Sequence, residues 1–87
     1  MPDIDVTLVG IRIEKLFEYS ETDGTTYLDW CHGQVVSVNV EKIKYATTRW
    51  DEECLRPRDC STTREKLLQT KWNPAQAKAG AWREYLV

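Results

Sequence analysis

Four aromatic residues next to loops and acidic residues form a pattern that can bind a cation. They are Tyr19, Trp30, Tyr45 and Trp50, and the acids that follow the last of them are Asp51 and Glu52. The face of an aromatic ring attracts a desolvated cation, and a nearby carboxylate adds to that attraction. We therefore predict that these six residues form a ligand-binding aromatic cage. The sequence is equally compatible with rings that belong to the core.

The cysteines and the histidine are possible metal ligands, namely Cys31, His32, Cys54 and Cys60. Four such ligands suit a structural zinc, but Cys31 and His32 are adjacent, whereas zinc sites usually separate paired ligands by about two to four residues. We therefore predict no metal and no other cofactor. Three cysteines cannot all pair within one chain, so reduced thiols and a nuclear or cytoplasmic location are expected.

Catalytic patterns are missing from the sequence. It contains one histidine and no Gly-x-Ser-x-Gly, phosphate-binding-loop or His-Glu-x-x-His pattern. Neighbouring residues on a strand point to opposite faces, so Asp51 and Glu52 are poorly placed to act as a paired acid and base. We predict a binding module that is not an enzyme, with no catalytic residues and no small-molecule substrate.

Charge is distributed unevenly along the chain. The net charge is −2, but residues 1–40 carry two basic and seven acidic residues, and residues 41–87 carry ten basic and seven acidic residues. The acidic first half favours a basic peptide as the partner. The second half offers a basic strip for nucleic acid, with aromatics available for stacking. Its residues are Lys42, Lys44, Arg49, Arg56 and Arg58, with Lys66 as a further candidate.

The 87 residues correspond to a single domain over residues 1–87. The apolar end at Val87 is consistent with a domain taken from a longer protein. No run approaches the roughly 18 apolar residues that span a bilayer, and the N-terminus lacks the pattern of a signal peptide. We expect no membrane partner.

Short antiparallel strands are predicted by the alternation of apolar and polar residues. Ile11 and Ile13 alternate with charged residues, which predicts a strand over about residues 9–19, and the alternation shifts near Lys15, which predicts a bulge or a bend. Asp23 and Gly24 predict a turn. The segments GQVVSVNV and IKYATTRW predict two further strands.

Residues 61–87 are predicted to form a helical or closing-strand extension. Thr62 and Glu65 have the spacing of a capping box, which predicts one or two helical turns over REKLLQ. The segment NPAQAKAG predicts another helical turn that ends at Gly80. The final AWREYLV alternates as a strand would, with a short helix as the alternative, and Trp72 and Trp82 are expected in the core.

The order of these features resembles the Tudor and chromo-barrel group of SH3-like barrels. The resemblance covers about residues 9–53 and rests on LVGIRIEKLFEY, on Trp30 followed by GQVVSV, and on KYATTRWDEE. It implies a mainly β fold, a small antiparallel SH3-like barrel. It also implies a non-enzymatic reader of methylated lysine or arginine, with Tyr19, Trp30 and Trp50 in the cage and Asp51 or Glu52 as the acid for lower methylation states.

Three functional hypotheses remain at this point. The first is a module that binds a basic or methyl-lysine-bearing peptide, such as a histone tail. The second is a nucleic-acid-binding module that uses the basic strip. The third is a structural domain that docks on the rest of its parent protein or on a second copy.

Overall fold

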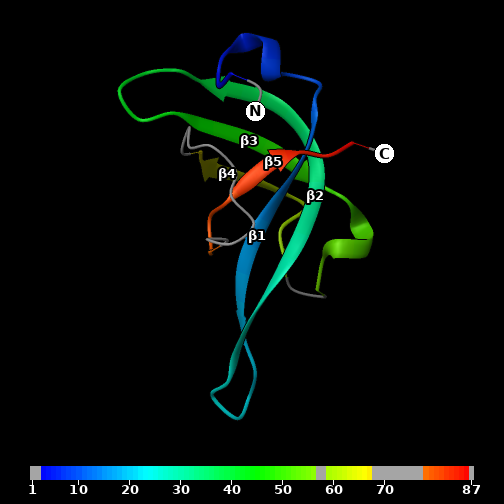
Figure 1. Cartoon of the computed structure of the whole chain (residues 1–87). Coiled ribbons are helices and arrows are strands. Elements are labelled where there is room, and N and C mark those ends of the chain that lie inside the picture. Colours follow the sequence, from blue (N-terminus) through cyan, green and yellow to red (C-terminus); the bar gives the residue numbers. More distant parts are fainter. Residues whose placement is uncertain (1–2, 57–58, 68–77, 87) are drawn as a thin grey trace.

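One antiparallel sheet organises the chain in the computed structural model, which describes residues 3–56, 59–67 and 78–86 (Figure 1). The five strands have the order β4-β3-β2-β1-β5. Their bounds are Arg12–Ser20 for β1, Thr26–Asn39 for β2, Tyr45–Trp50 for β3, Thr62–Lys66 for β4 and Trp82–Glu84 for β5. Two 3-10 turns, η1 (Val6–Leu8) and η2 (Glu52–Cys54), complete the elements of these ranges. No helix in the described ranges has the length and apolarity needed to cross a membrane.

The prediction of a mainly β, antiparallel fold is confirmed. The prediction of a barrel is not: β4 and β5 are the two edges of the sheet, and the described strands do not close on each other. The sheet is nevertheless strongly curved, because β2 bends around the core (Figure 1). Its register against β3 shifts between Val35 and Ser37, where one extra residue increases the local twist.

Strands β1 and β2 form a long hairpin that projects from the rest of the sheet (Figure 1). The predicted turn is confirmed, because Gly24 has a φ of 88° and the side chain of Asp23 accepts a hydrogen bond from the Thr25 amide at 2.9 Å. Of the bulge or bend predicted near Lys15, the bulge is wrong. All of β1 pairs with β2 without a register shift, and residues 13–16 are all buried because β1 lies between β2 and β5.

Gly33 permits a close approach of β2 and β3. A Cβ atom at this position would lie 2.5 Å from the Arg49 carbonyl oxygen and 2.8 Å from the Trp50 Cα. Both are backbone atoms, which cannot move aside as the end of a flexible side chain can. Because Gly33 has no side chain, Trp50, the last residue of β3, can pair with it at this close distance.

The core lies on one face of the sheet, which we call the core face, and we call the opposite side the outer face. Its apolar residues include Ile13, Val35 and Ala46 from three strands and Trp82 from β5, each 2% exposed or less. Residues of η1 and the segment before it also pack there, since Leu8 belongs to the same cluster. The expectation that Trp82 packs in the core is confirmed.

The helix predicted with Thr62 as its cap is wrong. Residues Thr62–Lys66 form β4, with Thr63 opposite Thr48 and Glu65 opposite Ala46 on β3. Alternation in TTREK and the open edge of β3 favour pairing over the local capping signal. The predicted closing strand is confirmed as β5, and Gly80 has a φ of 93° in the turn before it. Residues 68–77, which contain Trp72 and most of the second predicted helical turn, lie outside the described residues.

Candidate functional site

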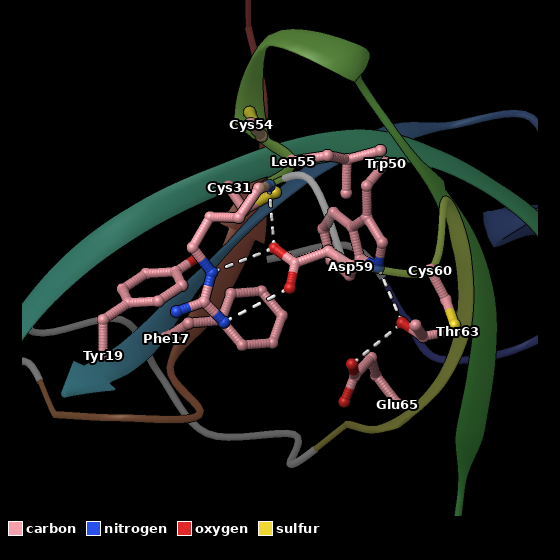
Figure 2. Close-up of a pocket in the computed structure, with 11 residues that line it drawn as sticks. Phe17, Tyr19, Cys31, Trp50, Cys54, Leu55, Asp59, Cys60, Thr63 and Glu65 are labelled. Atoms are coloured by element: carbon pink, nitrogen blue, oxygen red, sulfur yellow. Dashed lines mark hydrogen bonds and ion pairs between the residues drawn. The ribbon is translucent and has the colours of Figure 1, made fainter.

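A pocket of about 170 Å³ opens on the core face, between β1, the end of β3, the segment after η2 and β4. Figure 2 shows Phe17 and Tyr19 on one side of it, Trp50, Thr63 and Glu65 on the other, and Asp59 between them. We call this the aromatic pocket. It combines three aromatic rings with two carboxylates, a composition that suits a cationic group.

The three rings of the aromatic pocket are arranged by strand geometry. Phe17 and Tyr19 are two residues apart on β1, so both point to the core face, and their ring centres are 6.4 Å apart. Trp50 meets Phe17 edge to face, at 5.3 Å and 84°. The Trp50 indole Nε1 donates a hydrogen bond to the Thr63 Oγ1 at 2.7 Å, which fixes the indole although only 5% of this residue is exposed.

A cation of the chain itself, Arg56, lies at this pocket. Its guanidinium carbon is 4.8 Å from the centre of the Tyr19 ring. The guanidinium also donates hydrogen bonds to both carboxylate oxygens of Asp59, each at 3.2 Å, and the Arg56 amide donates to the same carboxylate at 2.9 Å. These hydrogen bonds from Arg56 hold the pKa of Asp59 below its ordinary value. Burial raises the pKa of Tyr19, which stays a neutral phenol.

The second carboxylate, Glu65, ties β4 to β1. It accepts a hydrogen bond from the Lys15 ammonium at 3.1 Å and another from the Thr63 hydroxyl at 2.9 Å. Lys15 is 7% exposed and its ammonium lies 5.1 Å from the centre of the Phe17 ring. This side of the pocket is therefore a charge pair that holds the two strands together.

Cysteine thiols also line the aromatic pocket. Cys31 of β2 is buried, Cys54 of η2 is half-buried, and Cys60 is exposed. Burial raises the pKa of the Cys31 thiol far above its ordinary value, so it stays protonated and is a poor nucleophile. These side chains contribute soft apolar surface to the wall.

A second, wider groove of about 370 Å³ adjoins the first. Its walls are Tyr27, Asp29 and Trp30 of β2 and Glu53 and Arg56 of the segment after β3. Tyr19 lies on both this groove and the aromatic pocket, and its ring stacks on Tyr27 with the centres 5.4 Å apart. We call this the β2 groove.

Trp30 and Tyr45, two of the predicted cage residues, do not line the aromatic pocket. Trp30 lies on the outer face of β2, where the guanidinium carbon of Arg83 is 4.3 Å from the ring centre. Tyr45 lies on the outer face at the other end of β3, with the Arg64 guanidinium carbon at 4.1 Å. Each ring therefore already stacks against a basic residue of the chain.

The predicted acids also have other positions. Asp51 accepts two hydrogen bonds from the Arg12 guanidinium, one of them at 2.9 Å, and its Oδ2 lies 2.8 Å from the His32 Nδ1. Arg12 above all, with a smaller contribution from His32, lowers the pKa of Asp51 to about 2. Glu52 is exposed in η2 and does not line either hollow described above.

The group of possible metal ligands differs from the set considered in the sequence. Among the described residues, one atom each of His32, Asp51 and Glu53 lie within 4.8 Å of one another, and this group contains no cysteine. Asp51 already accepts from Arg12 and lies beside His32, and the His32 ring stacks on Tyr85 with centres 4.5 Å apart. Through these contacts the cluster connects β2, the end of β3 and the segment after β5.

The residues of the predicted basic strip do not lie together on one surface. Arg49 is exposed on the outer face of β3, opposite Thr62, and Lys66 is exposed on the same face of β4. Lys42 and Lys44 lie in the turn between β2 and β3, whereas Arg56 lies at the aromatic pocket. Arg58 lies outside the described residues.

Five lining residues of the aromatic pocket were missed by the sequence reasoning, namely Phe17, Leu55, Asp59, Thr63 and Glu65. The two-residue spacing of Phe17 from Tyr19 was a usable signal, because strand alternation places them on one face. Glu65 reaches the pocket only through the pairing of β4 with β3, which the predicted helix obscured, and Asp59 reaches it through the path of the chain after η2. In the comparisons with known proteins, neither a family model, nor a curated protein, nor a solved structure matches this chain.

Proposed function

We propose that the chain is a non-enzymatic binding module that takes a basic side chain of a peptide, with methylated lysine as the favoured form, into the aromatic pocket. The observation that carries the proposal is the position of Arg56. Its guanidinium occupies the face of Tyr19 and pairs with Asp59, as a bound cationic side chain would. An external cation would replace it on the same ring and the same carboxylate.

The chemistry of the pocket supports a methylated cation in particular. Methyl groups spread the charge of an ammonium over a larger, weakly hydrated surface, which rings such as Phe17, Tyr19 and Trp50 bind well. The carboxylate of Asp59 complements the charge and is ionised at neutral pH. The strand order and this ring cluster also support a distant relation to the Tudor and chromo-type barrels, which we propose as the finer fold assignment.

The test is an NMR titration of the labelled chain with three small amides. They are the N-acetyl methylamides of trimethyl-lysine, of lysine and of the neutral tert-butyl isostere of trimethyl-lysine. We expect the Trp50 indole signal to shift with the trimethyl-lysine amide and to shift far less with the neutral isostere, because the isostere has the same shape without the charge. Equal shifts with both would show that the pocket selects apolar shape, and the proposal would then be wrong.

A matched pair of variants locates the binding. Tyr19→Ala removes a pocket ring, whereas Tyr45→Ala removes a ring that also stacks under an arginine but lies outside the pocket. Tyr19→Ala is expected to abolish the response to trimethyl-lysine, and Tyr45→Ala to keep it. The same loss in both variants would point to a general effect on the fold.

A second candidate function is nucleic-acid binding on the outer face of β2, β3 and β4. The observation that favours it is the polar and basic character of this face. Arg49, Arg64 and Lys66 are exposed there. None of the residues of β2, β3 and β4 that point to the outer face is acidic. Phosphate contacts of this kind give affinity that falls steeply with salt. A titration with a short DNA duplex at two salt concentrations tests it.

A further inference from the structure

The edge of β2 next to the β2 groove is open along several residues. Strand β3 ends at Trp50, which pairs with Gly33, but β2 begins at Thr26. Residues 26–32 pair with β1 on one side, and no described strand pairs with the other side of residues 26–31. An open strand edge has unpaired amide and carbonyl groups that can accept another strand.

Hydrogen bonds next to this edge show which backbone groups face it. The His32 carbonyl accepts from the Asp51 amide at 2.9 Å, the His32 amide donates to the Cys54 Sγ at 3.5 Å, and the Trp30 amide donates to the Asp29 Oδ1 at 2.9 Å. None of these partners belongs to β1. Because alternate residues of a strand direct their backbone groups to the same side, the amide and carbonyl of Leu28 also face away from β1.

The side chains of this edge do not protect it. Residues 26–30 read TYLDW, without the lysine or proline that commonly blocks an exposed edge. Tyr27 and Leu28 are 45% and 44% exposed. The Trp30 amide is bonded to the neighbouring Asp29 side chain, which is a local contact that an incoming carbonyl can replace.

The β2 groove runs along this open edge and favours a basic occupant. Asp29 and Glu53 stand on its two walls, and the one cation of its described lining, Arg56, is already paired with Asp59. Tyr19 joins the groove to the aromatic pocket. A chain that lies along the edge can therefore place a side chain in the pocket while its backbone pairs with β2.

We propose that an extended, basic segment of a partner protein adds as a strand to the open edge of β2, next to Leu28, and so delivers its cationic side chain to the aromatic pocket. This inference rests on the proposed function for the identity of the side chain. The backbone pairing supplies affinity, and the pocket supplies selectivity. When the peptide carbonyl takes the Trp30 amide, the carboxylate of Asp29 is released to pair with a basic side chain of the peptide.

The probe is an 11-residue peptide of alternating arginine and threonine with a central trimethyl-lysine, used with the full chain. Two further versions carry N-methyl groups on either the odd or the even residues. Only alternate residues of an added strand direct their amides to the edge. We expect one N-methyl version to bind about tenfold more weakly and the other within about twofold of the parent peptide. Hydrogen exchange of the Leu28 amide is expected to slow about tenfold with the parent peptide bound.

The outcomes separate this inference from the proposed function. If the trimethyl-lysine amide shifts Trp50, but both N-methyl versions bind equally and Leu28 exchange is unchanged, strand addition is wrong and the pocket proposal stands. If Leu28 is protected with the expected alternation while the amide leaves Trp50 unmoved, the edge binds basic strands and the pocket proposal is wrong. No response of Trp50 or Leu28 to either probe would overturn both.

Discussion

Removal of Arg56 is expected to strengthen the binding of a cationic ligand. In the structure this side chain occupies the Tyr19 face and the Asp59 carboxylate, so a ligand has to displace it. The change Arg56→Ala leaves both groups free and makes the pocket more negative by one charge. A substitution that removes a pocket residue ordinarily weakens binding, which makes an increase in affinity a distinctive result.

The size of the effect follows from how exposed the contact is. The Arg56 side chain is 58% exposed, so its contact with the ring corresponds to a preference of roughly two- to fivefold. The exposed pair with Asp59 adds a factor between about one and five. Together they favour the closed pocket over its open form by roughly two- to 25-fold, with a central value near fivefold. Since apparent affinity scales with the fraction of open pocket, Arg56→Ala should bind trimethyl-lysine about fivefold more tightly.

The assay is the titration of the Trp50 indole signal with the trimethyl-lysine amide. Arg64→Ala is the matched control, because Arg64 also stacks on a tyrosine but lies outside the pocket. It should leave the affinity within about twofold of the unaltered chain, as expected for a distant surface charge. Equal or weaker binding by Arg56→Ala would show that Arg56 is part of the wall of the site, and the reasoning from the resident cation would then be wrong.

Three further predictions concern stability and the second candidate function. Asp51→Asn should lower the free energy of unfolding at pH 7 by about 1–2 kcal/mol, a discounted figure for a side chain that is 27% exposed. Because the folded pKa of Asp51 is about 2 against an ordinary 3.8, this stabilisation is present above pH 3.8 and disappears as the pH falls toward 2. Gly33→Ala should cost about 1–3 kcal/mol in urea unfolding, since its Cβ meets backbone. Arg49→Glu with Arg64→Glu should weaken DNA binding and reduce its salt slope by about two if the outer face binds phosphates.

Each of these predictions has a contrary result. A destabilisation of Asp51→Asn that is the same at pH 2 and pH 7 would mean that its charge is not what stabilises the fold. A Gly33→Ala chain as stable as the original would contradict the close approach of β2 and β3. An unchanged salt slope after both charge reversals would remove the outer face from consideration as a phosphate-binding surface.

The strands were largely predictable from the sequence, because burial on one face imposes an alternation that needs no tertiary information. Strand β4 was not, since Thr62 and Glu65 fit a helix cap and TTREK fits a strand. Only the open edge of β3, a tertiary feature, decides between them. The long first half of β2 was missed for a related reason: its side chains are largely exposed and carry little alternation.

The candidate site was predictable only in part. Tyr19 and Trp50 do share a pocket, as the cage hypothesis required. Tyr45 could have been excluded from the cage from its position in the strand alone. It lies five positions before Trp50, and an odd number of positions places two residues of a regular strand on opposite faces. The position of Trp30 depends on the register of β2 against β1, and that of Asp59 on the path after η2. Neither is encoded in a local pattern.

The pairing of β5 with β1 has a consequence for how the chain folds. Strands β1, β2 and β3 each pair with the next strand in sequence, so their contacts close short loops, whereas Lys15 of β1 pairs with Trp82, 67 residues later. Closing the longer loop costs more chain entropy and brings its contacts later. Strands β1 to β4 are thus expected to form a paired meander before Trp82 docks against β1. The final buried tryptophan then completes the core as the last step of folding, and until it arrives the edge of β1 is open to pairing with other chains.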